Sequence, residues 1–208
     1  MSDPRTLLVG AGYDAMIDTW ESWSARIEDD PRAGWAADLA ERLPENARVL
    51  ELGCGGGTGE TAFLASRFAL TGIDLSERQL ERARSRVPNA DFVHGDLTAL
   101  EQPPASYDAV VAFYVLNHVP RELLPPLLAR IHAWLREGGW FMAAFGTSDE
   151  AAWTGEFLGA PTFFSSHPPA VNSALVRDAG FAIERNEVVA IGEPEGPVPF
   201  QWILAARA

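Results

Sequence analysis

The chain has 208 residues, a formal net charge of −13 and one cysteine. This length suits one α/β domain with a sizeable hydrophobic core. The negative charge, without a basic stripe, argues against a DNA or RNA partner, because phosphate binding requires clustered Arg or Lys. A single cysteine excludes a disulfide within the chain, which fits a reducing compartment. No apolar run approaches about 18 residues and no signal-peptide pattern is present, so we expect a cytoplasmic protein without membrane contact.

The N-terminal segment contains a pattern similar to a dinucleotide-binding loop. Residues 10–15 fit G-x-G-x-x-A after the apolar run 7–9. We reject this loop, because no strand ending in an acid follows at about 20 residues, as the fingerprint requires. Aromatic residues at helical spacing, including Trp20, instead predict a helix over residues 13–28. A second helix is predicted over residues 30–43, with a proline directly after it.

A strand, a glycine-rich loop and the start of a helix follow one another in residues 48–60. The strand is a short apolar run, after which Gly53, Gly55 and Gly57 occupy alternate positions. This order opens a nucleotide-binding βαβ unit, in which glycines allow a sharp turn and close approach of a ligand. The free N–H groups of the following helix suit an anionic group. A dinucleotide fingerprint would need glycine or alanine where Thr58 stands.

Two acids follow at the ends of predicted strands. An apolar segment ends in Asp74, about 20 residues after the first glycine, where a carboxylate can accept both hydroxyls of a ribose. Ser76 and Gln79 then have the spacing of a capping box. The arginines of the helix that they begin are expected to face solvent. A third strand is predicted within residues 90–97 and contains Asp96.

Residues 107–113 are apolar almost throughout and predict a central parallel strand. The segment after this strand contains His118, at the edge of the sheet where doubly wound folds bind ligands. A lone histidine is also common as a structural residue, so both interpretations stay open. A helix over residues 120–136, a glycine pair and a fifth strand over residues 140–146 follow.

Residues 147–168 interrupt the alternation of strands and helices. They are rich in aromatic residues, Gly, Pro and Ser, and long loops of this kind are usually lids or binding loops. We therefore expect an insertion that acts as a lid. A helix over 169–179 and strands over 181–189 and 200–206 complete the predicted sheet, with 192–199 as a Pro/Gly-rich connection.

Taken together, these motifs resemble those of small class I S-adenosylmethionine (SAM)-dependent methyltransferases of bacterial type. The glycine loop preceded by Glu51 is similar to the first motif of that family. The resemblance implies a single α/β domain over residues 1–208, with a helical cap over residues 1–45. The implied fold is a Rossmann-like three-layer sandwich with a seven-stranded, mostly parallel sheet and an antiparallel last strand. The matching segments are 49–60, 72–79, 91–97, 107–120 and 134–146.

The resemblance implies SAM as the cofactor and S-adenosylhomocysteine (SAH) as its product, with no metal. It places Tyr13 and Trp20 against the methionine end of SAM, although for Trp20 an ordinary helix packing on the sheet is the alternative. It also implies that Asp96 recognises the adenine. The implied cofactor-binding residues are Tyr13, Trp20, Gly53, Cys54, Gly55, Thr58, Asp74, Leu75, Gln79, Asp96, Leu97, Phe113 and Tyr114.

The resemblance also directs the segment after the fourth strand, and the insertion, toward a small-molecule acceptor. If the acceptor is a hydroxyl, His118 is the predicted general base, because imidazole titrates near neutral pH. His167 is the second choice, since the acid that similar proteins carry after it is replaced by Pro168. An amine or carboxylate acceptor would need no base. The implied acceptor-binding residues are Tyr114, His118, Trp153, Phe157, Phe163, Phe164 and His167.

The expected function is transfer of a methyl group from SAM to a small molecule, with oxygen or nitrogen favoured over carbon or sulfur. An NAD-dependent oxidoreductase is one alternative, because it would share the βαβ unit and Asp74. A SAM-binding protein without catalysis is another. A nucleic-acid methyltransferase is disfavoured by charge and because residues 113–116 lack an Asn/Asp-Pro-Pro-Tyr segment.

Overall fold

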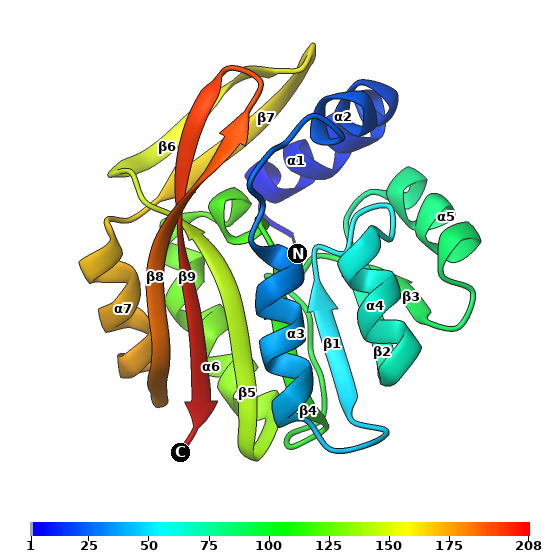
Figure 1. The fold of residues 1–208 in the computed structure, drawn as a ribbon. Coiled ribbons are helices and arrows are strands. Elements are labelled where there is room, and N and C mark those ends of the chain that lie inside the picture. Colours follow the sequence, from blue (N-terminus) through cyan, green and yellow to red (C-terminus); the bar gives the residue numbers. More distant parts are fainter. Residues whose placement is uncertain (1) are drawn as a thin grey trace.

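A computed structural model describes residues 2–208. Its centre is a seven-stranded sheet with the order β3-β2-β1-β4-β5-β9-β8, covered by helices on both faces (Figure 1). The strands are β1 (Arg48–Leu52), β2 (Ala69–Asp74), β3 (Asp91–His94), β4 (Tyr107–Ala112), β5 (Leu135–Gly146), β8 (Phe181–Glu193) and β9 (Gly196–Arg207). The helices are α1 (Pro4–Ala15), α2 (Ile17–Ser24), α3 (Arg32–Arg42), α4 (Gly59–Arg67), α5 (Glu77–Arg86), α6 (Leu124–Trp134) and α7 (Pro169–Asp178), with short 3-10 turns η1 (Leu116–His118) and η2 (Arg121–Leu123).

The pairing of the strands confirms the predicted Rossmann-like sandwich. The pairs β3–β2, β2–β1, β1–β4 and β4–β5 are parallel, whereas β9 runs antiparallel to both β5 and β8. The last strand is therefore antiparallel, as the resemblance implied. No helix within residues 2–208 has the length and apolarity needed to cross a membrane.

The central strand β4 separates two hydrophobic cores. Val110 and Ala112 face the core that includes α6, whereas Ala109 and Val111 face the core that includes α3 and α4. Neighbouring side chains on a strand point to opposite faces, so a strand covered on both faces must be apolar at every position. Because β1 to β5 run parallel, their carboxyl ends lie at one edge of the sheet.

The N-terminal helices differ from the prediction. The rejected dinucleotide-like loop is indeed no loop, because residues 4–15 form α1, but the predicted single helix over 13–28 is wrong. The side chain of Asp3 accepts the N–H of Arg5 at 2.8 Å and begins α1 early, and the helix breaks at Met16. Gly12 lies inside this helix because a Cβ there would be 2.5 Å from the carbonyl oxygen of Pro161.

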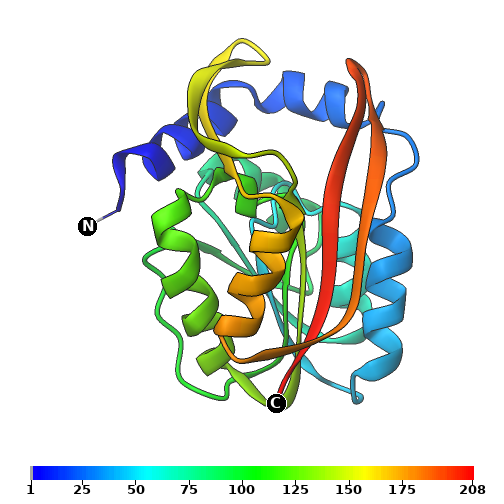
Figure 2. The ribbon, with the colours of Figure 1, turned by 90° about the vertical axis from the view of Figure 1, so that its left-hand side faces the viewer.

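The predicted loop over residues 147–168 contains a hairpin of β6 (Glu150–Phe157) and β7 (Ala160–Ser166). Its two tip residues, Leu158 and Gly159, have φ values of 52° and 83°, and positive φ at both central positions is what a type I′ turn requires. The connection predicted over residues 192–199 is also mostly strand, because β8 and β9 pair as far as Glu193 and Gly196. The hairpin and the extended ends of β8 and β9 rise above the sheet beside α1 and α2 (Figure 2).

Candidate functional site

The glycine loop lies at the carboxyl end of β1. The N–H groups of Gly53 and Cys54 donate to the carbonyl of Ile73 on β2, at 2.8 and 3.1 Å, and hold the loop against that strand. Gly53 has a φ of 68°, and a Cβ there would be 2.4 Å from Val115. Gly55 has a φ of 54°, and a Cβ there would meet no atom within 4 Å. The loop thus has no room for a side chain at Gly53, whereas at Gly55 it is open to a ligand.

Asp74 and Asp96 come from neighbouring strand ends. The carboxylate of Asp74 accepts the N–H of Gly55 at 2.8 Å and that of Ser76 at 2.9 Å. Burial raises the pKa of Asp74, and these hydrogen bonds partly oppose that effect. A carboxylate has about four acceptor positions, so two remain for a ligand. The carboxylate of Asp96 accepts the hydroxyl of Thr6 at 2.9 Å, which ties β3 to α1.

These elements surround a cavity that we call the cofactor cleft. All thirteen residues implied for cofactor binding line it: Tyr13, Trp20, Gly53, Cys54, Gly55, Thr58, Asp74, Leu75, Gln79, Asp96, Leu97, Phe113 and Tyr114. Cys54 is buried, and burial raises the pKa of its thiol, so it lines the cleft as a small protonated side chain. The sequence interpretation missed Thr6, Arg32 and Glu51, which also line the cleft.

Glu51 carries an unpaired oxygen at the floor of the cofactor cleft. Its Oε1 accepts the hydroxyl of Thr61 at 3.1 Å, whereas its Oε2 is buried without a hydrogen-bond partner in residues 2–208. Burial raises the pKa of this carboxyl to about 8. A buried polar atom without a partner is costly, so the oxygen fits a ligand that brings a donor. The methionine part of SAM brings an ammonium group, so the residues present fit this cofactor. The position of Glu51, two residues before Gly53, is the feature of the sequence that could have indicated this role.

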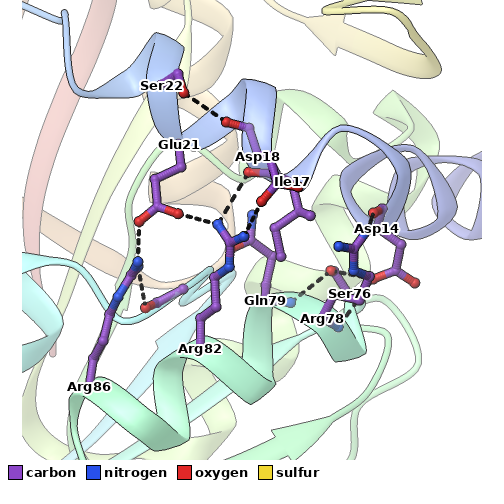
Figure 3. Close-up of polar contacts among 11 residues, drawn as sticks. Asp14, Ile17, Asp18, Glu21, Ser22, Ser76, Arg78, Gln79, Arg82 and Arg86 are labelled. Atoms are coloured by element: carbon purple, nitrogen blue, oxygen red, sulfur yellow. Dashed lines mark hydrogen bonds and ion pairs between the residues drawn. The ribbon is translucent and has the colours of Figure 1, made fainter.

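A group of charges joins α2 to α5 beside the glycine loop, and Figure 3 shows it. Arg82 on α5 forms ion pairs with Asp18 and Glu21 on α2, and Arg86 pairs with the same Glu21. Arg86 also donates to the carbonyl of Gly56 in the glycine loop at 3.1 Å. The prediction that the arginines of this helix face solvent holds for the exposed Arg84 and Arg86 but not for the partly buried Arg82, because the partners of Arg82 come from a helix far away in the sequence. We call Asp18, Glu21, Arg82 and Arg86 the cap clamp.

The last turn of α1 is held at the start of α5. The carboxylate of Asp14 accepts the hydroxyl of Ser76 at 2.5 Å and the N–H of Arg78 at 3.2 Å (Figure 3). The same Ser76 hydroxyl accepts the N–H of Gln79 at 3.1 Å, which confirms the serine half of the predicted capping box. The helix that carries Tyr13 is therefore fixed to the nucleotide-binding half of the sheet.

A second cavity of about 560 Å³ lies next to the cofactor cleft, and we call it the acceptor cavity. Tyr13, Trp20, Tyr114 and His118 line both spaces and form the wall between them. Of the residues implied for acceptor binding, the structure brings four to this cavity: Tyr114, His118, Phe157 and Phe164.

Three of the implied acceptor-binding residues lie elsewhere. Trp153 is 39% exposed on the outer strand of the hairpin. Phe163 is fully buried, with the guanidinium of Arg5 over its ring at 5.5 Å. His167 lines a separate small space beside Arg121. Neighbouring side chains on a strand point to opposite faces, and this determines whether Trp153 and Phe163 of the hairpin reach the cavity. Because the segment was interpreted as a loop, no such alternation was predicted for it.

His118 is buried and engaged at both ring nitrogens. Its Nδ1 lies 2.9 Å from the carbonyl oxygen of Phe163, and its Nε2 lies 3.0 Å from the hydroxyl of Tyr13. A carbonyl only accepts, so Nδ1 carries the proton and Nε2 accepts the phenol hydrogen. Burial lowers the pKa of His118 to about 4 and raises the pKa of Tyr13. Both side chains are therefore neutral at neutral pH, and the expectation that the imidazole of His118 titrates near neutral pH is wrong, because burial disfavours its charged form.

Tyr114 follows β4 in a strained conformation. Its φ is 54°, in the left-handed region that non-glycine residues seldom occupy. Its hydroxyl donates to Asp30 at 3.0 Å, and the guanidinium of Arg32 lies 5.3 Å from the centre of its ring. Strain of this kind costs about 1–3 kcal/mol and is concentrated at functional sites. Here it places the ring between the two cavities.

Comparison with known proteins agrees with this geometry. A family model described as a methyltransferase domain matches residues 49–139, which run from the start of β1 into the β5 region. Over these residues the chain is similar to methyltransferase domains, as its motifs also suggest. SAM is the cofactor of this family, and the residues around the cofactor cleft fit it. The matched part covers the glycine loop, both acids and the segment with His118.

Two relatives share this part of the sequence. The 27-O-demethylrifamycin SV methyltransferase of Amycolatopsis mediterranei is 35% identical over 144 residues, which are 58% of this chain and 52% of that protein. The trans-aconitate 2-methyltransferase of Variovorax paradoxus is 37% identical over 123 residues, or 56% of this chain and 47% of that protein. The chain thus spans about half the length of these relatives.

The fold also matches solved structures. The 1,6-didemethyltoxoflavin-N1-methyltransferase of Burkholderia thailandensis, solved with 1,6-didemethyltoxoflavin and S-adenosylhomocysteine, superposes with a TM-score of 0.69. The match covers 100% of this chain and 93% of the other at 23% identity, a level at which it supports the fold alone.

Proposed function

We propose that this protein transfers a methyl group from SAM to an oxygen or nitrogen atom of a small-molecule acceptor. The observation that carries the proposal is the wall of Tyr13, Trp20, Tyr114 and His118 between the cofactor cleft and the acceptor cavity. SAM, when bound, supplies a methyl group on a positively charged sulfonium. Two cavities that meet at one wall bring the reactants together, and positioning alone can supply about 7–11 kcal/mol of the barrier.

The residues of the cofactor cleft have separate roles in this proposal. The loop at Gly53 and Gly55 gives the methionine part access to the backbone, and Glu51 would hold its ammonium group through Oε2. Asp74 would accept the ribose hydroxyls, and Asp96 would contact the adenine. Aromatic rings of Tyr13, Trp20 and Tyr114 line the cleft and could attract the sulfonium charge through cation–π interactions.

If the acceptor is a hydroxyl, Tyr13 and His118 together remove its proton. The acceptor proton passes to the Tyr13 oxygen while the phenol proton passes to Nε2 of His118, along the 3.0 Å hydrogen bond. The proton would then reside on His118 as an imidazolium. SAM, when bound, would supply the methyl group and lose its sulfonium charge, so the buried site would keep its net charge. An amine acceptor is already nucleophilic and needs only the positioning.

The relatives support a small acceptor without specifying it. One is named for a methyl transfer at an oxygen of a rifamycin, and the toxoflavin enzyme for transfer at a nitrogen. The acceptor cavity favours catalysis over the alternative of a SAM-binding protein without a reaction. The family match favours SAM over the NAD of an oxidoreductase.

The cofactor role is tested by calorimetry with SAH and NAD. We expect SAH to bind and NAD to give no saturable signal. Replacing Asp74 with Ala removes two acceptors for the ribose and should weaken SAH binding by about 1–3 kcal/mol. Asp91→Ala, at an exposed acid on neighbouring β3, is the control and should leave the affinity unchanged. Unchanged SAH affinity in Asp74→Ala would remove Asp74 from the site.

The proton-transfer role is tested by single-turnover transfer of a labelled methyl group to a phenolic acceptor found by screening. General base catalysis contributes about 10²–10⁴-fold, so His118→Ala should lose that much. His167→Ala is the matched control, because His167 lies outside the acceptor cavity. A loss below about tenfold in His118→Ala, with SAH affinity intact, rejects the role and leaves positioning as the mechanism.

A further inference from the structure

Aromatic rings form one continuous side of the acceptor cavity. The ring centres of His118 and Phe164 are 4.6 Å apart, those of Phe164 and Phe157 are 5.6 Å apart, and those of Phe157 and Trp23 are 5.5 Å apart. Tyr114 and Phe200, which also line the cavity, form another close pair at 4.6 Å. Aromatic rings around a space of about 560 Å³ fit a flat apolar ring system, which packs well by offset or edge contacts.

Among residues 2–208, the charged side chains that line the acceptor cavity are acidic. Within residues 2–208, no Arg or Lys lines it, and burial keeps His118 unprotonated at neutral pH. Arg121 lies nearby, but its guanidinium pairs with Asp149 and donates to the carbonyl of Ser166 at 2.9 Å. The ionisable residues that line the cavity are Tyr13, Tyr114, His118, Glu150 and Glu193.

Glu193, the last residue of β8, lines the cavity and is held in place by its neighbours. The bridge between Glu28 and Gly192, with two N–H···O bonds of 2.9 Å, fixes the backbone next to it. The carboxylate of Glu195 accepts the indole N–H of Trp23 at 3.0 Å, so a second acid is fixed nearby. Burial raises the pKa of Glu193, and the charge of Glu195 raises it further. A cation placed near Glu193 would relieve both effects.

The reacting end of the same cavity lies at Tyr13 and His118. An acceptor that fills the space would place its nucleophile there and its ring against the aromatic side chains, within reach of the charge of Glu193, which also acts on Tyr13. A carboxylate or phosphate on the acceptor would meet a like charge with no cation to pair with, which opposes binding.

We infer that the acceptor is an aromatic molecule that carries a protonated amine or a neutral hydrogen-bond donor away from its nucleophile, and that the cavity rejects anionic acceptors. This inference rests on the proposed function, because it names the substrate class of the same site. It separates this protein from enzymes whose acceptors are carboxylic acids.

The test uses three probes that share a hydroxyphenyl ring and a short chain. Tyramine ends in an ammonium, 4-propylphenol in a methyl group and 3-(4-hydroxyphenyl)propanoate in a carboxylate. Each is titrated into the full chain saturated with SAH, and binding is followed by tryptophan fluorescence, since Trp20 and Trp23 line the cavity. We expect tyramine to bind about tenfold or more tighter than the propanoate, with the neutral probe between them.

Glu193→Gln keeps the shape of the side chain and removes its charge. It should weaken tyramine binding about fivefold, leave 4-propylphenol unchanged and strengthen the propanoate. Glu137→Gln is the control, because Glu137 is exposed near the start of β5 and distant from the cavity. Its three affinities should equal those of the parent chain.

Three results overturn the inference: a propanoate that binds as tightly as tyramine, an unchanged affinity ratio in Glu193→Gln, or no saturable binding of any probe. SAH affinity, measured in the same samples, separates these failures from failure of the proposed function. Normal SAH binding with any of the three results overturns the acceptor class alone. Absent SAH binding overturns the proposed function, and the acceptor class with it.

Discussion

Two covers lie over the same edge of the sheet, and they are held by different forces. The helix α2 reaches α5 through the cap clamp, a set of charges at the surface, and α1 reaches the start of α5 through Asp14. The β6–β7 hairpin is held by its inner strand, where Phe163 is fully buried and the hydroxyl of Ser165 donates to the carbonyl of Val119 at 2.5 Å. Figure 2 shows the two covers side by side above the sheet.

Because of this difference, we expect the covers of the two cavities to respond differently to salt. Ion pairs at the surface contribute about 0–1 kcal/mol each and weaken with salt, so the link between α2 and α5 depends on salt, whereas the buried Ile17 and Trp23 of α2 do not. Apolar burial and backbone hydrogen bonds respond little to salt, so the hairpin beside the acceptor cavity behaves as part of the fold. Substitutions in and below the two covers test this difference.

The largest effect is expected for Phe163→Ala. It removes a fully buried ring beneath the hairpin, and truncation of a buried Phe costs about 3–5 kcal/mol of the free energy of unfolding. Trp153→Ala, on the outer strand at 39% exposure, is the matched control and should cost less than about 1 kcal/mol. Urea unfolding measures both. Equal losses would contradict the division of the hairpin into an inner and an outer strand.

An intermediate effect is expected for Glu51→Gln, below the cap. An ordinary Glu titrates at 4.5, whereas burial raises the pKa of Glu51 to about 8 in the folded chain. The folded state thus keeps a proton that the unfolded state has lost between these values. The contribution of Glu51 to stability is full below pH 4.5 and declines as pH rises toward 8.

Urea unfolding at several pH values compares Glu51→Gln with the parent chain. The parent should lose stability relative to the variant from about pH 5 to pH 8, the interval set by the two pKa values. SAH should also release a proton on binding near pH 7 in the parent and none in the variant, because the ligand ammonium favours the ionised carboxylate. Parallel stability curves, or equal proton release by calorimetry, would show that Glu51 is not held protonated.

The smallest effect is expected for Arg82→Met. It removes the two ion pairs of Arg82 with α2 and should weaken SAH binding by about 1 kcal/mol at low salt, with little change in global stability. Arg84→Met is the matched control, since Arg84 pairs with Glu77 in its own helix at 2.7 Å. Calorimetry at low and high salt measures the difference. A deficit that stays the same at high salt would mean that the clamp acts by packing.

The parts predicted well from the sequence are those whose signal is local. β1 matches its predicted bounds, 48–52, because a strand covered on both faces is a continuous apolar run. The glycines and Asp74 lie together at one cleft, as predicted, because a tight turn and a strand-end acid each need a particular residue type at a fixed spacing. The residues implied for the cofactor all line one cleft for the same reason.

The parts predicted poorly depend on partners far away in the sequence. The hairpin could not be recognised, since its outer strand is mostly exposed and lacks an apolar alternation. Gly12 looked like part of a loop, and only its contact with Pro161 explains a glycine inside α1. Arg82 and Glu21 are 61 residues apart, so nothing in the neighbourhood of either predicts their ion pair.

The hydrogen bond between Tyr13 and His118 joins residues 105 positions apart. Contacts of such long range close large loops and form after the local ones, so we expect α1 to dock onto a sheet that already exists. Regions that dock last are also the first to open when a protein is warmed. Heating should therefore separate the wall between the two cavities before the sheet melts, and methyl transfer should fail at a temperature at which the chain is still folded.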